Sequence, residues 1–99
     1  MTITKKKEGG ALTMALEGRM DAVSAPELDE ALKAEIDDID ELVFDLEKLE
    51  YTSSAGLRVL LSAQKMMNKK GGMVIRNVRP EIMEIFDLVG FSDLLNIEA

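Results

Sequence analysis

Three consecutive hydroxyl side chains, those of Thr52, Ser53 and Ser54, stand directly before a segment whose pattern predicts a helix. Ala55 and Gly56 follow, and both are small enough for another backbone or a phosphate group to approach the first helical turn closely. A hydroxyl in this position suits three roles: it can cap the helix, act as a nucleophile, or accept a phosphate. The surrounding residue types determine how well each role fits.

The capping role depends only on position. A serine side chain before a helix accepts a hydrogen bond from a free backbone N–H group, which stabilises the helix by about 1 kcal/mol. Either Ser53 or Ser54 could be this cap. The same helix terminus also offers free N–H groups and a favourable dipole to an anion.

The nucleophilic role lacks the groups that would activate a serine. The chain contains no His and no Cys, so it can form neither a Ser–His–Asp triad nor an imidazole–thiolate zinc site. No lysine or carboxylate stands at a recognisable spacing to replace the histidine. A GxxxxGK[ST] phosphate loop and an EF-hand calcium loop are also missing from the sequence.

The composition restricts the class of partner. The 99 residues suit one domain with one core, 46% of them are apolar, and the net charge of −7 is spread along the chain. A protein of this charge is not expected to bind nucleic acid or an anionic membrane surface, both of which attract clustered Lys and Arg. A protein partner or a small ligand is left.

The sequence also bears on location. No apolar run approaches the ~18 residues that a membrane span requires, and the opening "MTITKKKEGG" lacks the apolar stretch of a signal peptide. The lack of Cys gives no sign of an oxidising compartment. We therefore expect a cytoplasmic protein.

The order of elements predicts an α/β fold. Residues 2–6 and 11–18 form a hairpin around "EGG", and a helix begins after Ser24, where Glu27 completes an apparent capping box. A buried strand at 42–46, a loop at 47–53, a second helix, a strand at 73–76, a third helix from Pro80 and a short strand at 94–97 follow. The predicted sheet is mixed and mostly parallel, with helices on at least one face.

Connections that follow parallel strands meet at the carboxyl edge of a sheet, where ligands and partners tend to bind. Ser53 and Ser54 stand in such a connection. Their neighbourhood is therefore the candidate functional site.

Residues 53–60, "SSAGLRVL", resemble a signature of STAS domains, specifically that of the bacterial anti-sigma factor antagonists. The segments "LEGRMDAVSAPEL" at 16–28 and "GGMVIRNVRPEIMEIFDLVGF" at 71–91 resemble other parts of the same family. The resemblance therefore spans nearly all of residues 1–99. It implies a single STAS domain, in which helices pack mainly on one face of a mixed sheet.

The resemblance also implies a set of functional residues. It places the phosphorylated serine at Ser54, and it puts Ser53 where many members carry Asp. The partner-binding residues that it implies are Asp21, Ser53, Ser54, Gly56 and Leu57. Asp21 is alternatively a solvated loop carboxylate, and Leu57 is either exposed beside Ser54 or buried beside the third helix.

The implied function is that of a switch and not of an enzyme. The unphosphorylated form of such a protein binds an anti-sigma factor, which is a serine kinase, and so frees a sigma factor. Phosphorylation at Ser54 ends this binding, and a PP2C-type phosphatase reverses it. The resemblance assigns no cofactor and no metal to the chain. The alternatives are a STAS subunit of a lipid or anion transport system and a small-ligand binding module.

Overall fold

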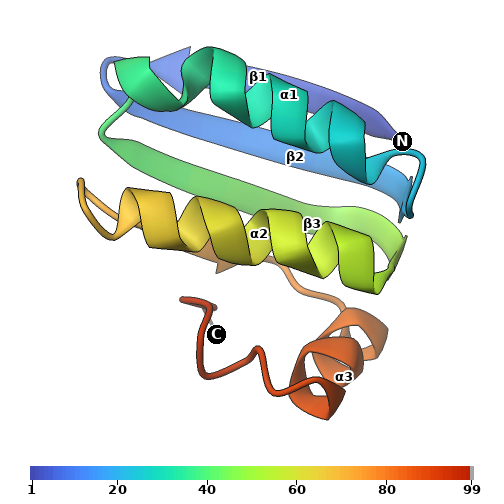
Figure 1. The fold of residues 1–99 in the computed structure, drawn as a ribbon. Helices are drawn as coiled ribbons and strands as arrows, with labels where there is room; N and C mark the ends of the chain where they lie inside the picture. The colour runs from blue at the N-terminus through green and yellow to red at the C-terminus, as the bar shows by residue number, and fades with distance from the viewer. Residues whose placement is uncertain (99) are drawn as a thin grey trace.

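The computed structural model describes residues 1–98, and its centre is a four-stranded sheet in the order β1-β2-β3-β4 (Figure 1). The strands are β1 (Thr2–Glu8), β2 (Ala11–Met20), β3 (Glu41–Thr52) and β4 (Met73–Arg76). β1 runs antiparallel to β2, whereas β2 with β3 and β3 with β4 are parallel pairs. The prediction of a mixed, mostly parallel sheet is confirmed.

The helices are α1 (Ala25–Glu35), the short 3-10 helix η1 (Ile36–Asp38), α2 (Ser54–Met67) and α3 (Pro80–Leu88). Figure 1 shows α1 and α2 lying alongside each other over one face of the sheet, with α3 apart from them near the C-terminal segment. Successive parallel strands are connected through α1 and α2, as expected for crossover connections.

The core forms where alternate strand residues point toward the helices. Because the register aligns equivalent positions, buried side chains stand in rows across neighbouring strands. One row is Leu12, Leu42 and Met73, and the next is Met14, Phe44 and Ile75. The opposite face of the same strands is only partly covered.

The predicted hairpin at the start of the chain is confirmed. Glu8 pairs with Ala11, so Gly9 and Gly10 alone make the turn. Gly9 has a φ of 60°, a conformation that glycine adopts without the steric cost of a Cβ atom.

The predicted loop at 47–53 is wrong, because β3 continues to Thr52. Residues Lys48–Thr52 pair with Glu17–Met20, with one irregularity in register before this stretch and a second within it. These irregularities give β3 two more residues than β2 over the same length of ladder, and they keep Leu49 and Thr52 buried. The strand therefore leads directly into Ser53.

The predicted short strand at 94–97 is reduced to one bridge, in which Ile97 lies parallel to Ile75. Leu95 is buried and anchors this segment, but Leu94 is 55% exposed. Val89 is also exposed and lies beyond α3, which ends at Leu88.

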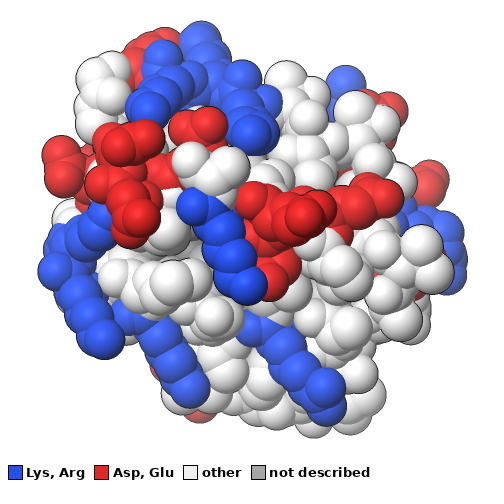
Figure 2. Space-filling view, turned by 45° about the horizontal axis from the view of Figure 1, so that its top comes forward, with Lys and Arg blue, Asp and Glu red and all other residues white. Residues whose placement is uncertain are grey.

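The surface mixes charges of both signs. Figure 2, which brings the upper side of Figure 1 forward, shows Lys and Arg side chains interspersed with Asp and Glu. No continuous basic patch dominates this face. A mixed face offers little of the clustered positive charge on which nucleic-acid binding depends.

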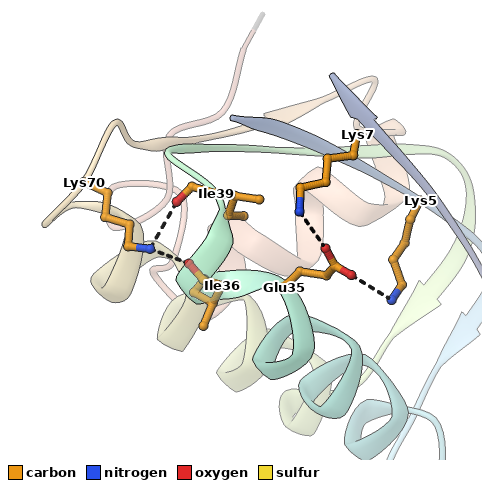
Figure 3. A network of polar contacts seen from close by, with 6 residues as sticks. All are labelled: Lys5, Lys7, Glu35, Ile36, Ile39 and Lys70. Carbon is orange, nitrogen blue, oxygen red and sulfur yellow. Dashed lines mark hydrogen bonds and ion pairs between the residues drawn. The ribbon is translucent and has the colours of Figure 1, made fainter. Parts of the chain in front are cut away.

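Lysine side chains fix the end of the first helical segment (Figure 3). Glu35 forms ion pairs with Lys5 at 3.8 Å and Lys7 at 3.5 Å, joining α1 to β1. The Lys70 ammonium donates to the carbonyls of Ile36 and, at 3.1 Å, of Ile39. Ile36 is the first residue of η1 and Ile39 directly follows it, and backbone acceptors at a helix end need such partners.

We expect Lys70→Ala to lower the free energy of unfolding by about 1–2 kcal/mol, because two carbonyls lose a charged donor. Lys69→Ala is the matched control, since Lys69 is the exposed neighbour and lacks these contacts. Urea denaturation of both variants measures the difference. Equal stabilities would show that water replaces the Lys70 ammonium without cost.

Candidate functional site

The candidate site lies where the connections after β2 and β3 meet. The backbone N–H of Ser53 donates to the carbonyl of Met20 at 2.8 Å, extending the parallel ladder by one bond. Asp21 follows Met20 directly, and Ser54 follows Ser53. The structure thus brings the loop that holds Asp21 to the same sheet edge as the two serines.

Ser53 is the residue that caps α2. Its backbone is extended, with φ −90° and ψ 173°, and its Oγ accepts from the N–H of Gly56 at 3.4 Å. Its carbonyl accepts from the N–H of Leu57 at 3.1 Å. This is the geometry of an N-cap, with a long side-chain hydrogen bond.

Ser54 has a different position. It is the first residue of α2 and is exposed. Within residues 1–98 its hydroxyl has no hydrogen-bond partner, so it is open to a second molecule. The capping role and the exposed hydroxyl therefore belong to two adjacent serines.

Gly56 lets the first turn of α2 pack closely against the sheet. A Cβ atom at this position would lie 2.6 Å from Met20 Cγ and 2.7 Å from Thr52 Oγ1. Both distances are too short, so a larger residue would push the helix away from the ends of β2 and β3. Gly56 is buried, and it positions the serines without offering a side chain to a partner.

Leu57 is 2% exposed, so of the two alternatives for this residue burial is confirmed and exposure beside Ser54 is wrong. The helical period places it on the same buried stripe as Leu60, Gln64 and Met67. Leu57 can affect a partner only through the position of the first turn.

The Asp21 carboxylate closes the loop between β2 and α1. Its Oδ1 accepts from the backbone N–H groups of Ser24 at 2.9 Å and Val23 at 3.0 Å, and it lies 3.1 Å from Ser24 Oγ. The Ser24 and Val23 N–H groups, followed by the Ser24 hydroxyl, lower the pKa of Asp21 below its ordinary value. The carboxylate therefore has a structural role in its own loop.

The predicted capping box at Ser24 is wrong. Ser24 already has helical angles, φ −84° and ψ −24°, and its side chain makes no capping hydrogen bond. Its Oγ accepts from Asp21 N at 2.9 Å and donates to Arg19 O at 2.9 Å. The signal for this arrangement was the Asp three residues before Ser24, because Asp side chains readily bond to backbone N–H groups just ahead of them.

Sequence reasoning missed two features near the site. Val23, on the Asp21–Ser24 loop, is 80% exposed although it is apolar. The Arg19 guanidinium lies 4.4 Å from the centre of the Tyr51 ring, a cation–π contact across β2 and β3. Neither Val23 nor Arg19 stands out in the sequence. The contact between Arg19 and Tyr51 depends on the irregular register of β3.

The described residues give no sign of a metal centre or a membrane span. Across 1–98, no three His, Cys, Asp or Glu side chains gather in a way that could hold a metal ion. Among the helices described, none has the length and apolar character needed to cross a bilayer.

The fold and the sequence together define the family. The STAS domain family model matches residues 2–99, and the chain belongs to this family.

Relatives of similar length share the resemblance. The chain is 34% identical over 99 residues to the candidate anti-sigma factor antagonist BtrV of Bordetella bronchiseptica, covering 98% of this chain and 85% of the relative. It is 28% identical over 100 residues to the anti-sigma-B factor antagonist of Bacillus subtilis, covering 100% and 92%. A solved anti-sigma factor antagonist from Mycobacterium paratuberculosis superposes with a TM-score of 0.87 at 26% identity, covering 97% of this chain and 83% of that one.

The two serines should differ in their effect on stability. We expect Ser53→Ala to lower the free energy of unfolding by about 1 kcal/mol through loss of the cap. Ser54→Ala should change it by less than about 0.5 kcal/mol, because an exposed hydroxyl without a partner is lost. Thermal unfolding of the two variants tests this, and a larger loss in Ser54→Ala would reverse the assigned roles.

The lowered pKa of Asp21 predicts a pH dependence. A carboxylate whose pKa is lower in the folded state stabilises the fold above its unfolded pKa, and this stabilisation is lost as pH falls through the folded pKa. The gap in melting temperature between the parent and Asp21→Asn should therefore be largest above about pH 5 and shrink toward pH 2. Glu50→Gln, which removes an exposed carboxylate from β3, is the control. A gap that is constant with pH would contradict the prediction.

Proposed function

We propose that this protein is an anti-sigma factor antagonist that phosphorylation at Ser54 switches off. The observation that supports this proposal most directly is the exposed Ser54 hydroxyl at the first position of α2, beside a second serine that already caps the helix. The names of the Bordetella and Bacillus relatives point to the same function.

In the unphosphorylated form, the partner binds across the edge where the two connections meet. Asp21, Ser53 and Ser54 give this edge its polar groups, and Val23 adds an exposed apolar side chain beside them. Gly56 and Leu57 are buried and contribute indirectly, because they fix the first turn of α2. An apolar side chain surrounded by polar groups is a common arrangement in a protein–protein interface.

Phosphorylation changes this surface without requiring a change of fold. A phosphate adds about −1.5 to −2 charges near neutral pH. The N-terminus of α2 favours an anion, so the modified domain stays folded. In the middle of an interface, however, the same charge must be desolvated and repels acidic groups of a partner. A cost of only about 1.4 kcal/mol already reduces affinity tenfold.

The chemistry of the switch belongs to the partners. An anti-sigma factor that is also a serine kinase binds the unmodified protein and transfers a phosphoryl group from ATP to the Ser54 oxygen. A PP2C-type phosphatase removes it. The protein itself has no catalytic role, since the chain holds no histidine or cysteine to activate Ser54. Such a cycle takes place in the cytoplasm.

The test is phosphorylation by the cognate kinase with ATP, followed by phosphopeptide mapping. Ser54→Ala should abolish phosphorylation yet keep partner binding, because it removes one hydroxyl that has no structural role. Ser54→Asp should weaken partner binding, by less than phosphate does because it has less charge, while circular dichroism stays like that of the parent.

Ser53→Ala is the matched control, since it changes the neighbouring hydroxyl and should leave Ser54 available to the kinase. Mapping of the phosphate to Ser53, or full-rate modification of Ser54→Ala, would move the site to another residue. Absence of any phosphorylation by a kinase that binds the protein would refute the switch itself.

A further inference from the structure

Arg58 is an exposed cation on α2, one helical turn beyond Ser54. The chain has four arginines, and three have partners in the structure: Arg19 lies over Tyr51, Arg76 pairs with Glu98, and Arg79 donates to the carbonyl of Glu47. Within residues 1–98 the Arg58 guanidinium has neither an ion pair nor a hydrogen bond. Its donors are therefore available to a group placed nearby.

The helix directs Arg58 toward Ser54. Residues four apart on a helix are neighbours, with roughly 5–6 Å between their Cβ atoms. Helical side chains also lean toward the N-terminus, which brings the turn that contains Ser54 within reach of a long side chain at position 58. Gly56 and Leu57 face the sheet, whereas Ser54 and Arg58 both face solvent.

The charges of α2 favour an added anion at this position. From Ser54 to Met67 the helix contains two basic residues, Arg58 and Lys65, and no acidic residue. No carboxylate of the same helix therefore competes for Arg58. The charged groups at the adjoining end of β2 are Arg19 and Asp21, and both already have partners.

We propose that Arg58 holds the phosphate of phosphorylated Ser54. This inference rests on the proposed function, because it requires a phosphate at Ser54. A guanidinium presents paired N–H donors that match two phosphate oxygens, and it is charged at every physiological pH. The phosphate is then fixed over the first turn of α2 and its dianionic form is favoured, which keeps the added charge close to −2 at neutral pH.

The test uses the full chain with phosphoserine incorporated at position 54 during translation, so that no kinase is needed. Phosphorus NMR then follows the second ionisation of the phosphate, whose ordinary pKa is about 6. A nearby cation favours the dianion and lowers this pKa. Arg58→Gln should therefore raise it by about 0.2 to 0.4 unit, and Arg58→Lys should raise it by less.

Lys65→Gln is the matched control, because it removes a cation of the same helix that lies roughly 16 Å from Ser54 along the helix axis. It should leave the pKa of the phosphate unchanged. Arg19 and Asp21 are the same in every variant and contribute equally. A structural effect of Arg58 on the helix alone would lower the melting temperature without moving the pKa.

The inference is overturned if Arg58→Gln and Lys65→Gln give the same pKa as the parent. It is also overturned if both variants raise the pKa of the phosphate equally. That result would indicate that the overall charge of the helix acts on the phosphate, and not a direct contact with Arg58. These outcomes are separate from the proposed function, because a kinase that modifies Ser54 normally would leave that proposal standing while the role of Arg58 failed.

Discussion

The parallel pairing of β2 with β3 is the constraint on which the rest of the site depends. It ends in the bond from the Ser53 N–H to the Met20 carbonyl, and this bond brings two connections that are distant in sequence to one edge of the sheet. Gly56 permits the close approach of α2 that this edge requires. If α2 lay farther from the sheet, the Ser53 cap would weaken and Ser54 would be displaced at the same time.

Adjacent residues at this edge have separate tasks, and helix geometry explains the division. Ser53, at the cap, turns its oxygen toward the helix, whereas Ser54, one position later, faces solvent. Gly56 and Leu57 turn toward the sheet. A surface residue can therefore be modified while its neighbours hold the fold, which is what a reversible switch needs.

Sequence patterns predicted those features that depend on local chemistry. The Gly9–Gly10 turn, the alternation of strands and helices, and the place of the serines before a helix all follow from short-range signals, and the structure agrees. The patterns failed where tertiary pairing decides the outcome. β3 is longer than its apolar run because residues Lys48–Thr52 find partners in β2.

The error at Ser24 and the open alternative at Leu57 share one cause. Local motifs suggested a cap for Ser24 and left Leu57 either exposed or buried, whereas contacts with other residues decided both. Asp21 takes over the N–H groups near Ser24, and the buried stripe of α2 includes Leu57. A motif names the residue types that suit a role, whereas packing selects which residue fills it.

The two irregularities in the register of β3 mark a place where related proteins can differ in length. They hold their extra residues between Asp45 and Tyr51, outside the regular ladder. A lineage could lose or gain a residue there by changing one irregularity, while the Met20 carbonyl still accepts from the N–H of the serine that directly follows the strand. Insertions and deletions at this place would thus leave the Ser54 hydroxyl in position, and alignments should permit gaps there while keeping the serine pair fixed.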